Sequence, residues 1–346
     1  MTLIAWGLFL LFVFAVLAID LFVLNKEAHA VSVKEAFAFT GVLAVLAIAF
    51  SGLVYVAYDQ HWLGLGLAVD AIDKQVNDGR LAAVKFLTGY LIELSLSTDN
   101  VFVIALIFQH LKIPAMYQHR TLFWGVLGAL VMRGVLIVVG AQLVARYHWV
   151  LYLFGAFLVY TAIKLLFQKE SAEGPDETGV VKLIRRFFPV TATLQEDHFT
   201  VRLDGRLFLT PLAIALILVE TTDLVFALDS IPAIFAITAD PFLVFTSNVF
   251  AILGLRSLYF ALAGAMDKFR YLKVSLAVIL AVVGLKMLLA DVLKDQLGPN
   301  ANLFLLVLVF AILLGGIVAS AAADAASKKR DASEGARGSD TPPDIR

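Results

Sequence analysis

The chain has 346 residues, of which 61% are hydrophobic and 16% charged, and its mean hydropathy of +0.89 is far above that of a soluble domain. A water-soluble core cannot bury so much apolar surface, so the composition predicts an integral membrane protein. The formal net charge of −1 argues against a nucleic-acid partner. The absence of cysteine excludes disulfides and thiolate metal sites within this chain.

Nine apolar stretches are long enough to cross a hydrocarbon layer of about 30 Å, which takes about 20 helical residues. They lie at about 2–24, 36–58, 84–109, 121–145, 149–167, 209–237, 242–265, 271–290 and 301–323. The first has no basic segment before it, so we expect a retained span and not a cleaved signal peptide. Since lipid offers no hydrogen bonds to the backbone, each stretch is predicted to be a helix. The expected fold class is therefore all-α, a polytopic transmembrane helix bundle over residues 1–323.

The distribution of lysine and arginine predicts the orientation of the bundle. These residues concentrate in the connections 26–35, 110–120, 168–208 and 266–273 and in the C-terminal tail. The opposite connections carry only Lys74, Arg80, Arg146 and Lys294. Because basic connections stay in the cytoplasm, the chain is expected to be a multi-pass protein of the cell (inner) membrane, with its N-terminus outside and its C-terminus in the cytoplasm.

Two segments are predicted to lie outside the lipid. The cytoplasmic loop 168–208 leads into a stretch, His198 to Leu209, that alternates around Asp204-Gly205 and predicts a small β-hairpin. The tail 324–346 is rich in Ala, Ser, Gly and charged residues. It has little apolar surface to bury and is expected to be a disordered cytoplasmic tail.

The chain also contains an internal repeat. Residues 98–102 (Thr-Asp-Asn-Val-Phe) in the third span match residues 222–226 (Thr-Asp-Leu-Val-Phe) in the sixth. A lone arginine follows in the next span of each copy, and a matching lysine segment in the one after it: Arg133 and Lys164, then Arg256 and Lys286. Similar composition explains shared leucines but not this matched order of charges. Each copy has three spans, 84–167 and 209–290, so the second copy is inverted, as in many secondary transporters.

Apart from Asp20 near the cytoplasmic end of the first span, five acidic side chains fall inside the predicted spans, and they are Glu93, Asp99, Glu220, Asp223 and Asp229. An unpaired charge at the bilayer centre costs about 2.5–3.5 kcal/mol on insertion scales, so these groups require compensation. At 100° per residue, Glu220 and Asp223 share a helix face, whereas Asp229 points the opposite way from Glu220. Pro232 is expected to kink or unwind the helix near Asp229, which would bring that carboxylate to the same cavity.

The candidate ligands are all oxygen atoms. Every histidine lies in a loop or at a span end, and there is no cysteine, so hard cations such as Mn²⁺, Mg²⁺ or Ca²⁺ are favoured over copper or zinc. The predicted metal ligands are Glu93, Asp99, Asn100, Glu220, Asp223 and Asp229. Additional ligands are expected among Ser97, Thr98, Thr222 and Asn248. Protonation of acids that bind no metal would couple transport to protons.

A structural explanation competes with this one. The acids would then pair with the buried bases in an ionic core that binds nothing. Those bases, predicted to be gating or structural charge partners, are Arg133, Arg256, Lys164 and Lys286. Asp99, Asp223 and Asp229 are favoured as ligands or proton carriers, whereas Glu93 and Glu220 fit either role.

Three blocks of sequence carry a resemblance to a known family. Residues 93–100 (Glu-Leu-Ser-Leu-Ser-Thr-Asp-Asn), 220–233 and 246–260 resemble the signature segments of the TerC family. That resemblance extends over about residues 1–323 and implies a member of the lysine-exporter superfamily linked to manganese homeostasis and tellurium resistance. It also implies that the family's acidic metal-handling residues correspond to the five acids above. Leu224 stands where the first copy has Asn100, so the site is expected to be asymmetric.

The function we expect is therefore a cytoplasmic-membrane exporter of Mn²⁺ that works by alternating access and proton coupling, with no permanent cofactor. Two alternatives stay open. The first is a membrane-assembly or metallation partner of the secretion machinery, and the second is an exporter of a small organic cation or amino acid. An enzyme is not expected, because no span pairs a nucleophile with a base and no loop carries a phosphate-binding motif. Tellurite is an anion and therefore a poor substrate for an acid-lined site. Any tellurium resistance would then be an indirect effect.

Overall fold

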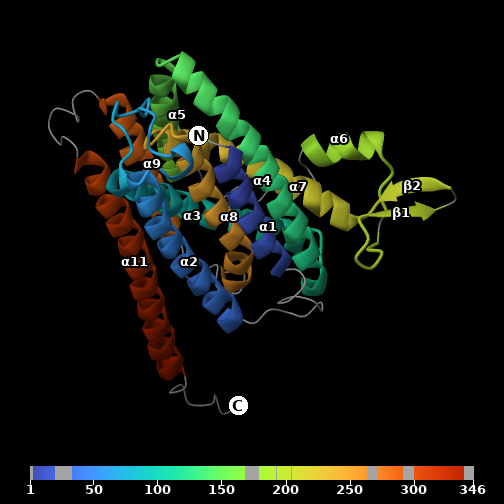
Figure 1. The fold of residues 1–346 in the computed structure, drawn as a ribbon. Coiled ribbons are helices and arrows are strands. Elements are labelled where there is room, and N and C mark those ends of the chain that lie inside the picture. Colours follow the sequence, from blue (N-terminus) through green and yellow to red (C-terminus); the bar gives the residue numbers. More distant parts are fainter. Residues whose placement is uncertain are drawn as a thin grey trace, which may run out of the picture.

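The computed structural model describes residues 3–19, 33–167, 179–191, 193–203, 205–262, 271–290 and 300–338, which are mostly helical (Figure 1). The helices are α1 (Leu3–Ile19), α2 (Val33–Asp59), η2 (Trp62–Gly64), α3 (Gly79–His110), α4 (Ala115–Arg146), α5 (Val150–Phe167), α6 (Gly179–Phe187), α7 (Pro211–Phe235), α8 (Pro241–Leu262), α9 (Leu272–Leu288) and α11 (Ala301–Gly338). Two antiparallel strands, β1 (Thr200–Leu203) and β2 (Arg206–Leu209), precede α7.

The polytopic helical membrane fold is confirmed. In the described part of the chain, seven helices are long and apolar enough to cross a membrane, and they are α2, α3, α4, α5, α7, α8 and α11 over 301–323. Helices α1 and α9 have 17 residues each, about 26 Å of helix, which is slightly short of the hydrocarbon layer. Nine spans therefore remain a prediction for the first and eighth stretches.

Local sequence signals fix where the long helices begin. The Asp78 carboxylate accepts a hydrogen bond from the Leu81 backbone N–H at 2.7 Å, which caps α3. The Thr210 hydroxyl oxygen accepts one from the Ala213 N–H at 3.4 Å, and Pro211 follows as the first residue of α7. Both helices thus start where the sequence supplies a cap.

The core is built around α8, which is almost entirely buried. Helix α3 packs along α8, α4 packs along α7, and α5 packs along α9, while α2 covers α3 and α8 and α11 covers α3 and α9. Gly155 of α5 and Gly284 of α9 allow their helices to approach closely. A Cβ atom added to Gly284 would lie 2.9 Å from the Gly155 carbonyl oxygen, and one added to Gly155 would lie 3.1 Å from the Gly284 carbonyl oxygen.

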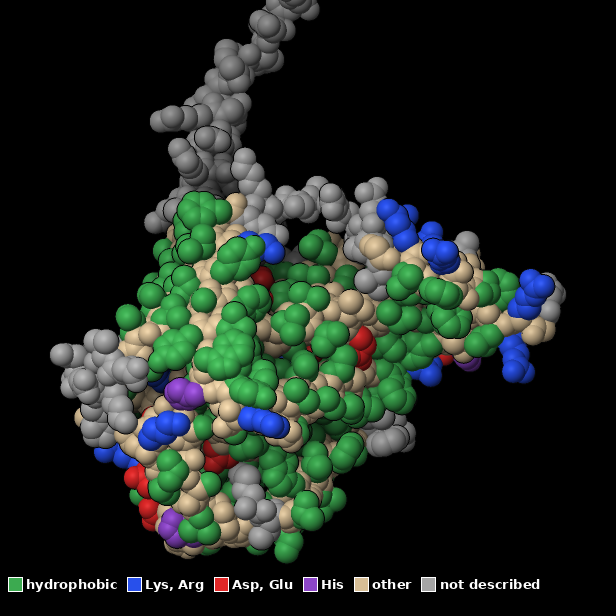
Figure 2. All heavy atoms as spheres, turned by 90° about the horizontal axis from the view of Figure 1, so that it is seen from above, with side chains coloured by type: hydrophobic (Ala, Val, Ile, Leu, Met, Phe, Trp, Pro, Cys, Tyr) green, Lys and Arg blue, Asp and Glu red, His purple; other side chains and the backbone are tan. Residues whose placement is uncertain are grey.

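The two ends of the bundle differ. The β1–β2 hairpin and α6 project from one end, which we call the hairpin end, and the connection 60–78 covers the other, the loop end (Figure 1). Hydrophobic side chains cover much of the bundle surface in Figure 2, and Lys and Arg gather on the projecting part. An outward apolar surface of this kind is what a lipid-facing protein requires.

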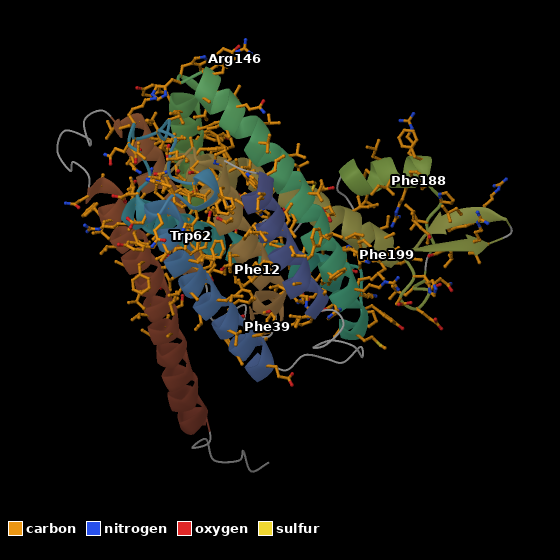
Figure 3. All side chains as sticks on the ribbon, in the orientation of Figure 1. Phe12, Phe39, Trp62, Arg146, Phe188 and Phe199 are labelled. Atoms are coloured by element: carbon orange, nitrogen blue, oxygen red, sulfur yellow. The ribbon has the colours of Figure 1, made fainter. Side chains whose placement is uncertain are left out.

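The predicted hairpin is confirmed, with Thr200 opposite Leu209 and Leu203 opposite Arg206, and with Gly205 at a φ of 76° in the turn. Its base is held by Arg120 of α4, which forms an ion pair with Asp197 and lies 5.3 Å from the Phe199 ring centre (Figure 3). Helix α6 was not predicted from the sequence. Its Lys182, Arg185 and Arg186 supply basic charge beside the hairpin.

Two expectations differ from the structure. Helix α11 continues to Gly338, whereas the tail from Asp324 was expected to lack structure. The Ala-rich sequence there has high helix propensity, which extends the last span. Residues 339–346 lie outside the described residues. The unwinding expected near Asp229 is also wrong, because α7 is continuous from Pro211 to Phe235 with Pro232 inside it. Pro232 lies only three residues before the end of α7. The backbone hydrogen bond that it cannot donate therefore belongs to the last turn, and its loss does not interrupt the helix.

Candidate functional site

Four helices meet at the buried guanidinium of Arg133 on α4. Its Nη2 donates to Asp223 Oδ1 of α7 at 2.7 Å and its Nε donates to Asp223 Oδ2 at 3.2 Å, a two-point contact. Its Nη1 donates to Glu93 Oε1 of α3 and, at 2.9 Å, to Asn248 Oδ1 of α8. Arg133 is 1% exposed and Glu93 0%. We call this group, with its neighbours on α3, the central site.

The α3 side of the central site carries oxygen atoms without donors. Glu93, Ser97 and Asn100 are four and three residues apart, so they lie on one face of α3 within about 60° of each other. All three are buried. Among the residues that the structure describes, no hydrogen-bond partner reaches Glu93 Oε2, Ser97 Oγ or Asn100 Oδ1. Buried oxygens in this state are costly, and their chemistry suits a ligand that donates a hydrogen bond or carries positive charge.

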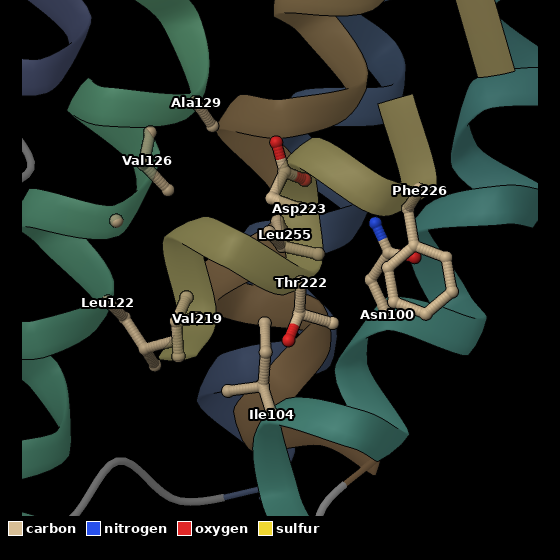
Figure 4. A pocket seen from close by; sticks show the side chains of 11 residues that line it. Asn100, Ile104, Leu122, Val126, Ala129, Val219, Thr222, Asp223, Phe226 and Leu255 are labelled. Atoms are coloured by element: carbon tan, nitrogen blue, oxygen red, sulfur yellow. The ribbon is translucent and has the colours of Figure 1, made fainter. Parts of the chain in front are cut away.

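A small cavity lies beside Asp223 on the hairpin side of the central site. Figure 4 shows its walls, which come from α3, α4, α7 and α8 and include the polar side chains of Asn100, Thr222 and Asp223. The remaining wall is apolar and includes Leu122, Val126 and Leu255. Its free volume is about 10 Å³, close to what one water molecule needs. The cavity therefore suits a single small ion or water.

Among the described residues, the other three predicted acids have no bond to Arg133. Glu220 packs on α4 at Gly128, where an added Cβ would overlap its carboxylate, and Asp223 acts on it electrostatically. Asp229 faces α5 and accepts a hydrogen bond from the Thr161 hydroxyl at 3.1 Å, with Lys164 acting on it electrostatically. Asp99 is turned about 120° from Glu93 around α3.

The Lys273 ammonium of α9 acts on Asp99 electrostatically. Within the described residues, no three acidic or histidine side chains come together in a metal-binding arrangement. The structure thus brings together Glu93, Asp223 and Asn248 at Arg133, with Asn100 beside them in the cavity, whereas Asp99, Glu220 and Asp229 form no bond to Arg133 among the described residues. The common cavity expected for all five acids is not what the structure contains.

The remaining predicted residues have clear positions. The hydroxyls of Thr98 and Thr222 donate to the carbonyls of Leu94 at 2.9 Å and Leu218 at 2.7 Å, so each keeps an oxygen lone pair free. Lys286 donates to the Ala236 carbonyl at 3.0 Å and to Asn302 Oδ1 at 2.9 Å, near the loop end. Arg256 is buried on α8, and Lys164 is exposed on α5.

Sequence reasoning missed a second polar group, which we call the loop-end cluster. It consists of Lys85, Asp70, Asp73, Asn77, Thr238 and Asp240 with Tyr58. The Lys85 ammonium lies 2.8 Å from both Asp70 and Asp73 and donates to Asn77 Oδ1 at 2.6 Å. The only signal in the sequence was a lysine just inside a predicted span.

The cluster joins the connection 60–78 to the end of α7. The Thr238 hydroxyl donates to Asp70 Oδ2 at 2.5 Å, and the Ala239 N–H donates to Asp70 Oδ1 at 3.0 Å. The Tyr58 hydroxyl donates to Asp240 Oδ2 at 2.9 Å. Every one of these bonds crosses between segments, so the cluster closes the loop end of the bundle.

Two carboxylates of the loop-end cluster have opposite pKa shifts. Burial acts to raise the pKa of Asp70, but the Lys85 ammonium and the bonds from Lys85, Thr238 and Ala239 together hold it below its ordinary value. Burial raises the pKa of Asp240, and the bond from Tyr58 offsets that rise only in part. Asp70 is thus stabilised as a carboxylate, whereas Asp240 is biased toward its neutral form.

Comparison with known proteins places these groups in a family context. Residues 79–330 match the integral membrane protein TerC family. The chain is 46% identical over 316 residues to an uncharacterised membrane protein of Myxococcus xanthus, and the aligned residues make up 91% of each chain. It is 42% identical over 314 residues to the putative membrane-bound redox modulator Alx of Escherichia coli, which covers 90% of this chain and 94% of that one. No solved structure matches the chain.

Proposed function

The chain belongs to the TerC family of integral membrane proteins, and we propose that it exports a hard divalent metal ion, Mn²⁺ above all, across the cytoplasmic membrane. One observation carries the proposal. Three buried oxygens on one face of α3, Glu93 Oε2, Ser97 Oγ and Asn100 Oδ1, have no donor among the described residues. Glu93 shares Arg133 with Asp223, and Asn100 lines the same cavity as Asp223.

The chemistry of these groups supports a hard cation. Carboxylate, amide and hydroxyl oxygens bind Mn²⁺, Mg²⁺ and Ca²⁺, whereas copper and zinc favour sulfur and imidazole. The ligands proposed to reach the ion are Glu93, Ser97, Asn100, Asp223 and Asn248. The free volume of about 10 Å³ supports a single ion over an amino acid or another organic cation. Thiol exchange is not available to this chain, which has no cysteine.

The transport path is proposed from the repeat. Helices α3–α5 and α7–α9 would form the two inverted units, and the central site would lie where α3 and α7 meet. The close contact between Gly155 of α5 and Gly284 of α9 supports a pairing of the last helices of the two units. Rocking of one unit against the other would then expose the ion first at the cytoplasmic hairpin end and then at the loop end.

Energetics support coupling to protons. Moving two positive charges outward against an inside-negative potential of 100 mV costs about 4.6 kcal/mol. Protons that enter in exchange would supply this free energy. The candidate carriers are the acids that form no bond to Arg133 in the described part of the chain, Asp99, Glu220 and Asp229.

The experiment is transport by the purified chain in proteoliposomes. Mn²⁺ movement is measured against Mg²⁺, Ca²⁺ and Zn²⁺, with a pH gradient that is imposed and then collapsed, for the wild type and Asp223→Asn. We expect Mn²⁺ transport that depends on the gradient and is lost in Asp223→Asn at an unchanged protein level. Equal transport by both proteins would refute the site. No transport of any metal, with secretion proteins co-purifying, would instead favour a metallation partner.

A further inference from the structure

We infer that Arg133 is a tethered cation that occupies the carboxylates of Glu93 and Asp223 while the site holds no metal, and that it leaves them when the ion binds. The inference rests on the proposed function and adds a role for this arginine. Its guanidinium contacts both acids at once, with two bonds to Asp223 and one to Glu93. It therefore sits where the strongest two ligands of a metal ion would converge.

The charges at the site favour replacement of Arg133 by the metal ion over binding of both cations together. Glu93 and Asp223 carry two negative charges, and Arg133 carries one positive charge. A divalent ion bound beside Arg133 would leave one uncompensated positive charge at the site, whereas an ion that displaces the guanidinium toward another acid or toward solvent leaves none there. An unpaired buried charge is strongly destabilising. The neutral arrangement is thus metal without the guanidinium contact.

The choice of arginine matters, because a guanidinium is a permanent cation in proteins. The acids are therefore vacated only when the side chain of Arg133 moves. The same contact protects the empty carrier, since two buried carboxylates without a cation would be costly. Arg133 thus allows the empty site to return across the membrane without carrying another cation.

The test is Mn²⁺ binding to purified full-length protein in nanodiscs, followed by loss of the free Mn²⁺ electron paramagnetic resonance signal. Arg133→Gln is expected to bind Mn²⁺ at least about tenfold more tightly than the wild type, because a unit charge about 4 Å from the ion is removed. Its transport in proteoliposomes should fall despite the tighter binding. Arg146→Gln, at the exposed end of the same helix, should match the wild type in both measurements.

A second variant guards against misfolding of Arg133→Gln. Arg133→Lys keeps one positive charge beside the two acids, so its Mn²⁺ affinity should lie nearer to that of the wild type than to that of Arg133→Gln. An Arg133→Lys affinity as high as that of a folded Arg133→Gln would overturn the inference. So would weaker binding by a folded Arg133→Gln.

The outcomes separate this inference from the proposed function. Wild-type binding that is weakened by Arg133→Gln refutes the tethered cation and leaves the metal site standing. Binding by Arg133→Gln alone supports the inference in its strongest form, with the arginine outcompeting the ion. If neither the wild type nor either Arg133 variant binds Mn²⁺, both proposals fail.

Discussion

The ammonium of Lys85 lies 2.8 Å from a carboxylate oxygen of Asp70, and neither side chain is exposed. The same ammonium reaches Asp73 at 2.8 Å, so one lysine at the start of α3 serves two acids of the connection 60–78. Asp70 in turn accepts bonds from Thr238 and Ala239 after α7. Lys85 and Asp70 thereby join α3, the connection 60–78 and the α7–α8 turn in one hydrogen-bonded network.

Replacement of Lys85 by methionine should therefore destabilise the protein strongly. Asp70 and Asp73 would lose the ammonium that contacts them both, and removing one partner of a buried pair costs about 3–5 kcal/mol. We expect a clear fall in the thermal unfolding midpoint of the purified protein in detergent. Lys182→Met on the exposed face of α6 is the matched control and should leave the midpoint unchanged. A similar midpoint for both variants would contradict a structural role for Lys85.

Asp70 and Asp240 should respond to pH in opposite directions. The pKa of Asp70 is lowered by folding, so its stabilisation is present above the unfolded value of about 3.9 and is lost as pH falls through the folded pKa. The pKa of Asp240 is raised, so its stabilisation is present below about 3.9 and is lost as pH rises through the folded pKa.

Thermal unfolding midpoints at two pH values distinguish the two carboxylates. Asp70→Asn should lower the midpoint at pH 7, and the difference from the wild type should shrink toward pH 3. Asp240→Asn mimics the neutral acid and should preserve or raise the midpoint at pH 7. A loss of stability at pH 7 that is as large in Asp240→Asn as in Asp70→Asn would contradict this assignment.

Replacement of Gly128 should affect transport only through Glu220. A methyl group at this position would overlap the Glu220 carboxylate, so the acid has to move from its present place against α4. If Glu220 carries protons, Gly128→Ala should reduce the pH-gradient dependence of Mn²⁺ transport while the protein still folds. Gly52→Ala on α2, where nothing lies within 4 Å of an added Cβ, should transport as the wild type does. Unchanged coupling in Gly128→Ala would exclude Glu220 as a carrier.

The sequence identified the class of fold and part of the central site for clear physical reasons. Acids and bases in apolar spans have to find each other, so Glu93, Arg133 and Asp223 were accessible to reasoning. Which acids share a pocket depends on helix rotation, and it is Asn100 and not Asp99 that shares a face with Glu93. The loop-end cluster depends on how residues 60–78 fold back, and no local pattern near Asp70 encodes that contact. Pro232 acted too near the end of α7 to unwind it.

The contrast between Asp223 and Asp229 tests that rotation argument directly. The two residues are six apart on a continuous α7, so their side chains point about 120° away from each other. Asp223 faces Arg133, and Asp229 faces Thr161 of α5 at 3.1 Å. Asp223→Asn should therefore weaken Mn²⁺ binding by more than about tenfold, equivalent to about 1.4 kcal/mol. Asp229→Asn keeps the contact with Thr161 and should change Mn²⁺ affinity little. Equal losses of affinity in the two variants would mean that α7 unwinds when the ion binds, as Pro232 first suggested.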